Sequence, residues 1–282
     1  MTSMASSNKI TGFYWTFFLM MFVIFSSSTL AISSSQREFD YYLLALEWPG
    51  TMCKSVSKCC NTNGCCDSSV PLYEFTIHGL WANYDDGTWP SCCGSTKTDF
   101  EINQVLPLMG EILKYWPSFS CSSTSLCHGK NGLFWAHEWE KHGTCMFPEI
   151  KDEYTYFSTT LDLYAKYNIT KMLENAGLLA SNDASYPLTE VISAIESGVG
   201  ASPTVTCSSG NVEEIRICFY KNFKPRDCVL ESNSAYNKLY SSSCPEYINL
   251  PSFTSIGKGR NSTVTWLAEE EATQKVIELS SI

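Results

Sequence analysis

Fourteen cysteines in a chain of 282 residues restrict the folds that this sequence can adopt. They lack the repeated CxxC spacing of a zinc ribbon, so disulfide bonds formed in an oxidising compartment explain them better. The other residues are typical of a globular protein, because 44% are hydrophobic and only 17% are charged. The chain is long enough to bury one substantial core or two small ones.

The first 33 residues have the three parts of a secretory signal peptide. Lys9 supplies a positive charge, Phe13 to Phe25 is apolar, and Ser26 to Ser33 offers small residues for cleavage. The apolar part is shorter than the ~20 residues of a membrane-spanning helix, so we expect cleavage, with an uncleaved anchor as the alternative. No other long apolar run follows, and we expect no membrane association after cleavage.

The net charge limits the kinds of partner that the protein can bind. It is -10 for the whole chain, and removal of residues 1–33 with their single lysine makes it −11. A general nucleic-acid-coating protein is excluded, because such binding depends on a basic surface. Two glycosylation sequons, at Asn168 and Asn261, agree with passage through the secretory pathway.

Hydrophobic patterns predict an α+β fold, because strand-like and helix-like segments do not alternate as regular βαβ units. Strands are expected over residues 41–48, 74–81 and 213–220. Residues 53–66 contain five cysteines and are expected to form a disulfide-linked loop.

Helical spacing predicts three longer helices. They are expected over residues 101–116 despite Pro107, over 132–142 with Gly143 as the cap, and over about 152–176.

The residues able to carry chemistry lie in two short segments, one around His78 and one that contains His137 and His142. In a helix, the second segment also brings Glu138 beside His142 and Lys141 beside His137, because residues four apart are neighbours. Burying so many titratable groups is costly, so we expect them to line a cleft and not a core.

The second segment is close to the zinc-protease motif HExxH but does not match it. Three residues, not two, separate Glu138 from His142. On an α-helix His137 and His142 would lie about 140° apart, which is too far to share one metal ion. We therefore expect no metal site.

Two histidines with a lysine and a carboxylate suit the cleavage of RNA through its own 2′-hydroxyl. One imidazole removes the 2′-OH proton and the other protonates the departing 5′-oxygen. Lys141 can stabilise the extra charge on phosphorus, and Trp81, Trp89 and Phe134 can stack on bases. The alternatives are a structural histidine at position 78 and core packing for Trp81 and Trp89.

Both segments resemble the two active-site signatures of the T2 family of ribonucleases. His78-Gly-Leu-Trp-Ala82 is similar to the family pattern His-Gly-Leu-Trp-Pro, and His137 to Cys145 matches His-Glu-x-x-Lys-His-Gly-x-Cys in full. The resemblance covers about residues 39–250 and is strongest to plant S-like ribonucleases with a cysteine-rich loop and a C-terminal extension. It implies a central antiparallel sheet flanked by several helices, with a signal peptide at 1–33, a catalytic domain at 34–250 and an extension at 251–282.

The resemblance also implies a role for each site residue. His142 would be the general base on the 2′-OH, His78 the general acid and His137 the phosphate ligand. Glu138 and Lys141 would stabilise the transition state. The product would be a 2′,3′-cyclic phosphate, later hydrolysed to a 3′-phosphate, with no metal or other cofactor and little sequence specificity. The implied base sites are Trp81, Asn83 and Trp89 for the first base and Phe134 for the second.

Two positions depart from the family pattern. Ala82 replaces a proline, which we expect to have a modest effect. Glu47 stands where many relatives have glutamine near the base site, and an ionised carboxylate accepts hydrogen bonds but cannot donate them. We therefore expect Glu47 to disfavour uracil and cytosine and to tolerate guanine.

The resemblance implies five disulfides and leaves four cysteines unassigned. Cys65, Cys66, Cys92 and Cys127 could form two further bridges, but their pairing does not follow from the sequence. The implied pairs are Cys53–Cys59, Cys60–Cys121, Cys93–Cys145, Cys207–Cys244 and Cys218–Cys228.

The resemblance further implies a monomer that acts on single-stranded RNA in the vacuole or endoplasmic reticulum, with secretion as the alternative. A pollen-rejection S-ribonuclease is disfavoured by the net charge of −11, since those relatives are usually basic. An inactive storage or binding glycoprotein is disfavoured because His78 and His142 are both present. We expect a rate optimum on the acid side of neutral, where histidines are protonated and repulsion of RNA is weaker.

Overall fold

The computed structural model describes residues 37–56, 59–60, 63–66, 72–94, 99–228 and 244–254. The predictions for the signal peptide, for Asn261 and for residues 255–282 lie outside the described residues. Within the described part, no helix is long and apolar enough to cross a membrane.

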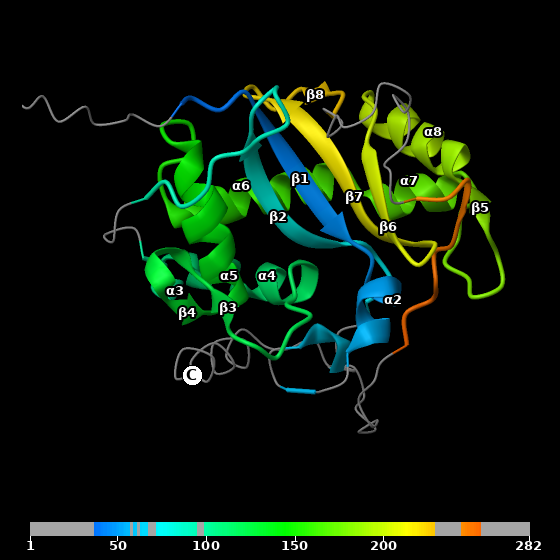
Figure 1. Cartoon of the computed structure of the whole chain (residues 1–282), viewed down its shortest axis with the longest axis horizontal. Helices are drawn as coiled ribbons and strands as arrows, with labels where there is room; N and C mark the ends of the chain where they lie inside the picture. The colour runs from blue at the N-terminus through cyan, green and yellow to red at the C-terminus, as the bar shows by residue number, and fades with distance from the viewer. Residues whose placement is uncertain are drawn as a thin grey trace, which may run out of the picture. The chain divides into compact units, whose positions relative to one another are not determined.

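An antiparallel sheet in the order β2-β1-β7-β6, with β8 paired to β7, forms the centre of the fold (Figure 1). β1 lies between β2 and β7 and is buried along its whole length, which explains its continuous apolar sequence. The three expected strands are confirmed with ends that differ by at most two residues. The strands of this sheet are β1 (Tyr41–Glu47), β2 (Thr76–Asn83), β6 (Thr204–Ser208), β7 (Asn211–Tyr220) and β8 (Pro225–Arg226).

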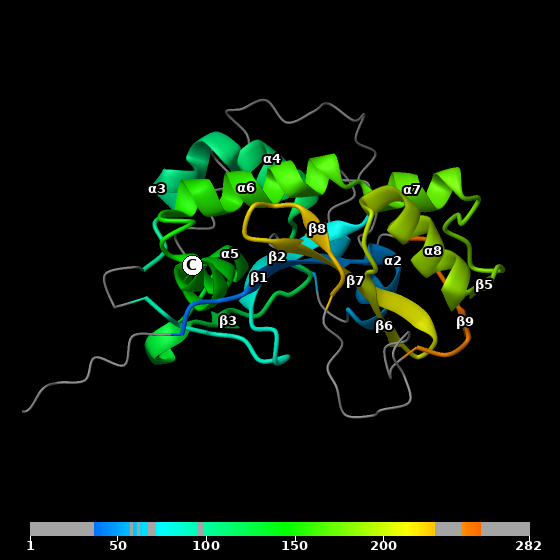
Figure 2. The same ribbon diagram turned by 90° about the horizontal axis from the view of Figure 1, so that it is seen from above.

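Helices and short strand pairs surround this sheet, and α6 and α7 run along one of its faces (Figure 2). The α-helices are α2 (Pro49–Met52), α3 (Ile102–Val105), α4 (Met109–Tyr115), α5 (Phe134–His137), α6 (Glu153–Lys166), α7 (Ile169–Asn175) and α8 (Leu188–Val199). The short strands are β3 (Thr124–Ser125) with β4 (Asn131–Gly132) and β5 (Tyr186–Pro187) with β9 (Tyr247–Ile248). Single 3₁₀ turns occur at Cys53–Ser55, Gly64–Cys66, Leu106–Leu108, Cys127–Gly129 and Gly143–Met146.

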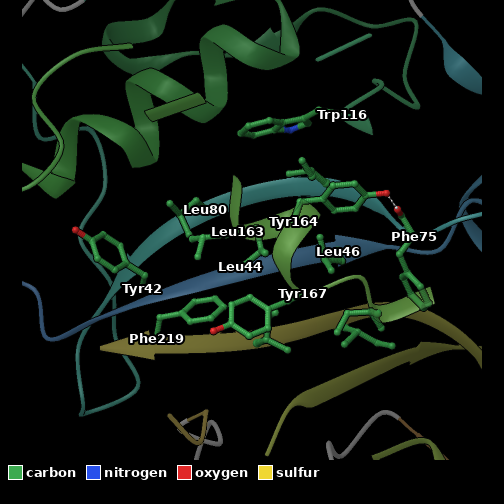
Figure 3. Packing of buried hydrophobic residues seen from close by; sticks show 14 of the residues in the cluster. Tyr42, Leu44, Leu46, Phe75, Leu80, Trp116, Leu163, Tyr164, Tyr167 and Phe219 are labelled. Carbon is green, nitrogen blue, oxygen red and sulfur yellow. Dashed lines mark hydrogen bonds between the residues drawn. The ribbon is translucent and has the colours of Figure 1, made fainter. Parts of the chain in front are cut away.

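The hydrophobic core lies between the sheet and α6 (Figure 3). Large side chains of this kind each contribute about 1.5–3 kcal/mol when they are fully buried. The Tyr164 hydroxyl donates a hydrogen bond of 2.7 Å to the carbonyl of Phe75, so its polar end is satisfied inside the core. The layer contains Tyr42, Leu44 and Leu46 from β1, Leu80 from β2, Phe219 from β7, and Leu163 and Tyr164 from α6.

Two of the three predicted helices are each divided. The prediction for 101–116 is wrong at Pro107, which has no N–H to donate and lies in a 3₁₀ turn between α3 and α4. The prediction for 152–176 is wrong near Asn168, whose side chain accepts a hydrogen bond of 2.8 Å from the Lys171 amide. This cap starts α7 as a separate helix.

The described part of the chain contains seven disulfides, and four of the five implied pairs are confirmed. The pair Cys53–Cys59 is wrong, since Cys53 bonds Cys65 and Cys59 bonds Cys66. The 3₁₀ turn at Gly64–Cys66 carries Cys65 back to Cys53, and both sulfurs are buried against Leu72. Cys92 and Cys127 form the seventh bond.

The first residues of the proposed C-terminal extension pack against the sheet domain. The Trp48 indole donates a hydrogen bond of 2.8 Å to the carbonyl of Pro251, and both residues are buried. A Cβ on Gly50 would lie 1.9 Å from the same carbonyl oxygen, so a glycine is required here. The packed part of the chain therefore continues past residue 250.

Candidate active site

His78 lies at an irregularity in the edge strand β2. Ala45 of β1 pairs with Gly79, but its neighbour Leu46 pairs with Ile77, so His78 is an extra residue on β2. A bulge of this kind redirects a side chain. The His78 side chain is 30% exposed, and its carbonyl accepts a hydrogen bond of 2.7 Å from the Trp116 indole.

The second segment is not a regular α-helix. After α5, residues Glu138–His142 form a π-helical turn, in which residues five apart lie close to the same face. The rings of His137 and His142 are 6.0 Å apart between centroids. The prediction that these histidines diverge by about 140° is therefore wrong.

The π-helical turn also changes the argument about a metal. Ligand atoms of His137, Glu138 and His142 lie within 4.8 Å of one another, so the spacing does not separate them. The expectation that these residues lie too far apart to share one metal ion is therefore wrong.

Gly143 follows the last residue of the helical segment, His142, as expected, but it lacks the left-handed conformation of a typical glycine cap. Gly143 keeps a right-handed helical conformation and leads into a 3₁₀ turn. A Cβ at this position would lie 2.4 Å from the Trp139 ring, so a glycine is required for this close packing.

The two segments meet around Trp81 and Glu138. The Trp81 indole donates a hydrogen bond of 2.9 Å to Oε2 of Glu138. The Trp81 ring stacks on His142 at 5.1 Å and meets the edge of His78 at 4.9 Å. A Cβ on Gly79 would lie 2.0 Å from Glu138 Oε2, which explains the glycine that follows His78.

The two central histidines differ strongly in their affinity for a proton. Burial, together with the positive charges of Lys141, His137 and His78, lowers the pKa of His142 to about 2. Burial also disfavours a charged His78, but Glu47, Glu214 and Glu138 outweigh it and raise the pKa of His78 to about 10. His142 is therefore neutral and His78 protonated over the whole range between those values.

Glu138 is buried at the centre of the site, with 1% of its surface exposed. Burial raises its pKa to about 7, against the opposing effects of His78, Trp81 and Lys141. Its Oε1 atom has no hydrogen-bond partner among the described residues and lies 3.9 Å from Nε2 of His78. This oxygen can meet a ligand that enters between the histidines.

His137 and Lys141 flank the pair on the helical side. Nδ1 of His137 donates a hydrogen bond to the carbonyl of Ser125 in β3, so its Nε2 faces Glu138 at 4.0 Å from Oε1. Burial lowers the pKa of His137, with Lys141 and His78 adding to the effect. The backbone carbonyl of Lys141 accepts a hydrogen bond of 2.9 Å from the amide of Cys92.

The residues predicted to bind bases occupy different surroundings. Phe134 lies 6.0 Å from the His78 ring, and Trp81 contacts both histidines. Trp89 is 54% exposed and Asn83 is buried at the end of β2. Across the described ranges, no hydrogen bond or ring contact joins Trp89 or Asn83 to the histidines, and their role stays a prediction.

Sequence reasoning missed two residues of the site, Glu214 and Arg216 on β7. Oε2 of Glu214 lies 2.7 Å from Nδ1 of His78, and Arg216 bonds the other oxygen of the same carboxylate. Glu47, which was assigned to the base site, lies 3.4 Å from the same Nδ1. The alternation of side chains along a strand could have indicated these two residues. It places Glu214 and Arg216 on the face of β7 opposite to that of the buried Ile215 and Ile217.

A neutral imidazole and a protonated imidazole on either side of a buried carboxyl group can transfer two protons across a phosphodiester. Held on a disulfide-bonded α+β fold, this arrangement of histidines and carboxyl group is that of a ribonuclease. The chain matches the Ribonuclease T2 family over residues 39–228 and belongs to that family.

Known proteins agree with this assignment. Ribonuclease 1 of Arabidopsis thaliana is 36% identical over 205 residues, which cover 71% of this chain and 84% of that protein. Trichomaglin, described as a novel S-like ribonuclease, is 44% identical with a TM-score of 0.69, covering 77% of this chain and all of that structure. RNase NT, solved with 5′-AMP, is 30% identical with a TM-score of 0.62 and the same coverage. The protein is thus a T2-type enzyme that cleaves RNA.

Proposed function

We propose that the protein is an endoribonuclease that cleaves single-stranded RNA by acid–base transphosphorylation, with His142 as the base and His78 as the acid. The observation that carries this proposal is the placement of both rings on the Trp81 indole, at 4.9 Å for His78 and 5.1 Å for His142, beside the buried Glu138. The pKa values of the two rings are shifted in opposite directions, downward for His142 and upward for His78, which supports it. At the working pH a general base must be deprotonated and a general acid must be protonated. His142 meets the first condition and His78 meets the second.

In the first step, His142 takes the proton of the 2′-hydroxyl, and the 2′-oxygen attacks the adjacent phosphorus. The bond to the 5′-oxygen breaks, and that oxygen receives the proton of His78 Nε2. The products are a 2′,3′-cyclic phosphate and a free 5′-hydroxyl. Hydrolysis then reverses the roles: His78 takes a proton from water, the resulting hydroxide opens the ring, and His142 protonates the 2′-oxygen to leave a 3′-phosphate.

The charge on the phosphorane is stabilised from the helical side. When protonated, His137 Nε2 and Glu138 Oε1, which lie 4.0 Å apart, can each donate a hydrogen bond to a phosphoryl oxygen. The positive charge of Lys141, which acts on both His137 and His142, adds to this stabilisation. None of these roles requires a metal ion.

The substrate is single-stranded, because its bases must leave the stack to contact the protein. Phe134 and Trp81 beside the histidines support base stacking with little sequence preference. The 5′-AMP bound by the related RNase NT supports a nucleotide site. Trp89 and Asn83 belong to the first base site in this proposal.

The protein would reach its substrate through the secretory pathway as a monomeric glycoprotein, with residues 1–33 removed and 251–282 as an extension. The disulfides and the signal-like N-terminus support this route. The vacuole or endoplasmic reticulum is the proposed site of action, with secretion as the alternative.

Incubation of the purified protein with yeast RNA in EDTA tests the proposal. We expect cleavage to persist, with a 2′,3′-cyclic phosphate visible by ³¹P NMR. His78→Asn and His142→Phe should each lower the rate about 10²–10⁴-fold, the range of a positioned proton transfer. Inertness at every pH from acid to neutral would instead indicate a storage or binding glycoprotein, and a near-normal rate in His142→Phe would refute its assignment as the base.

A further inference from the structure

Glu214 lies behind His78 on the far side of β1. β7 and β2 are not neighbours in the sheet, and Glu214 pairs in register with Glu47 of β1. Its Oε2 nevertheless reaches Nδ1 of His78 at 2.7 Å, and only 8% of its side chain is exposed. The contact therefore joins the third strand of the sheet to the histidine of the edge strand.

The pairing of Glu214 with Glu47 has a cost. Two carboxylates directly opposite each other on neighbouring strands repel, and both of these are buried. The repulsion is offset where the two meet the ring of His78, since Glu47 also lies within 3.4 Å of Nδ1. Burial alone would raise the pKa of Glu214, but the hydrogen bond from His78 and the charges of His78 and Arg216 lower it, so Glu214 is the ionised partner.

Arg216 fixes the orientation of this carboxylate. Its Nε bonds Oε1 of Glu214, which leaves Oε2 for His78. The guanidinium also lies over the Trp81 ring at 5.7 Å, and Trp81 donates to Glu138. Both oxygens of Glu214 therefore have fixed partners.

We propose that Glu214 is the positioning residue of the general acid: it accepts the Nδ1 proton of His78 and so directs Nε2 to the leaving oxygen. This inference rests on the proposed role of His78. With Nδ1 tied to Glu214, the ring cannot flip, and Nε2 faces the space beside Glu138 Oε1 at 3.9 Å. The charged and titratable groups around His78 are Glu47 from β1, Glu214 and Arg216 from β7, and Glu138, His137, Lys141 and His142 from the helical segment.

A comparison of two substrates tests whether Glu214 positions the general acid or only stabilises the fold. A dinucleoside phosphate releases an alkoxide, which needs a proton from the acid, whereas the same nucleoside 3′-(4-nitrophenyl phosphate) releases a phenolate that does not. Glu214→Gln should lower kcat on the dinucleotide about 10–100-fold, part of the range of general acid catalysis, and change kcat on the aryl ester less than about threefold. Loss of the Glu214 charge should also lower the pKa of His78, so the fall that His78 causes near pH 10 in the wild type should move to lower pH.

Two further variants serve as controls for Glu214→Gln. Glu190→Gln makes the same charge change on the exposed first turn of α8 and should alter neither substrate. Glu214→Asp keeps the negative charge, but its shorter side chain moves the carboxylate away from His78. Its kcat on the dinucleotide should therefore lie between those of the wild type and Glu214→Gln. If Glu214→Gln does not fold, as judged by its thermal unfolding, the Asp variant decides by the same comparison of substrates.

Each result has one meaning. Equal losses on both substrates, or no loss on either, would overturn the positioning role of Glu214. His78→Asn is the reference for the proposed function: if it too loses both substrates equally, His78 is not the acid and the proposed function fails first. If His78→Asn spares the aryl ester and Glu214→Gln does not, only the present inference fails.

Discussion

The carboxyl group of Glu138 is buried, and its Oε1 atom has no hydrogen-bond partner in the described part of the chain. Its pKa is raised to about 7, so the group is neutral below that pH and negative above it. In its neutral form Oε1–H can donate to a phosphoryl oxygen, whereas its ionised form repels the phosphate. His78 stays protonated up to about pH 10 and so does not cause a fall near neutrality. The expected acid-side optimum thus has a specific origin in Glu138.

Glu138→Gln tests this origin. The wild-type kcat/KM should fall as the pH rises through about 7, and the variant should remove most of that fall because its amide is neutral and still donates. The measurement is kcat/KM on one dinucleotide from pH 4 to pH 9. Glu153, in the first turn of α6, also has a pKa raised to about 7 by burial, and it accepts a hydrogen bond from the Glu101 amide. Glu153→Gln is therefore the matched control and should keep the fall. An unchanged fall in Glu138→Gln would contradict the assignment.

The predicted effect of Glu47 on base preference depends on pH, because burial raises the pKa of its carboxyl group. Below about pH 7 its carboxyl is protonated and can donate, much as glutamine does. Glu47→Gln should therefore leave the preference among dinucleotides unchanged at pH 5 and should reduce the advantage of guanine at pH 8. Relative cleavage rates of four dinucleotides at both pH values measure this. Identical preferences at pH 8 would show that Glu47 does not face the base.

At the scale of elements, the bulged strand β2 and the π-helical turn depend on a glycine where they touch. Gly79→Ala places a Cβ 2.0 Å from Glu138 Oε2 and 2.5 Å from Trp81 Nε1, so the bond between them must break. We expect an activity loss of about 10²-fold, as for a 1 Å misplacement of catalytic groups, and a destabilisation of about 1–3 kcal/mol. Gly110→Ala on α4 meets nothing within 4 Å and should stabilise the protein by about 0.5–1 kcal/mol with unchanged activity. Equal activity in both variants would contradict this account.

The elements that the sequence predicted well are those with a clear hydrophobic period. The continuous apolar run from Tyr41 and the alternation around Ile215 located β1 and β7 within two residues. The π-helical turn was missed because an i to i+5 hydrogen-bond pattern leaves no period of its own in side chains. Glu214 was missed because an acidic residue beside a core position usually faces solvent, and only the fold brings His78 across β1 to meet it.

At the scale of the whole molecule, two adjacent cysteines after β2 connect the parts of the site. Cys92 bonds Cys127, beside the β3–β4 pair that holds His137 through Ser125. Cys93 bonds Cys145, in the 3₁₀ turn that follows His142. The family resemblance implied Cys93–Cys145 but not Cys92–Cys127, because cysteine pairing depends on how loops that are far apart in sequence meet in the fold. Cys93–Cys145 therefore holds the turn after His142 against the segment after β2, and Cys92–Cys127 holds the turn between β3 and β4 there.

Stability and activity should therefore respond differently to different disulfides. Cys93–Cys145 closes a separation of 52 residues and Cys207–Cys244 one of 37 residues, and chain entropy gives each a stabilisation of about 4 kcal/mol. Replacing either pair by alanine should lower the free energy of unfolding by similar amounts in urea titrations. Only loss of Cys93–Cys145 should also lower kcat, by about tenfold or more, since it alone releases the turn after His142.

The comparison is made at a temperature where urea titration shows both variants more than 99% folded, so that lost activity does not reflect lost protein. His142→Phe in the background without Cys93–Cys145 adds a second check. If the disulfide acts by positioning His142, its removal should cost much less once His142 is gone, because coupled residues are not additive. Additive losses, or an equal fall in kcat without Cys207–Cys244, would mean that the disulfides stabilise the fold without positioning His142.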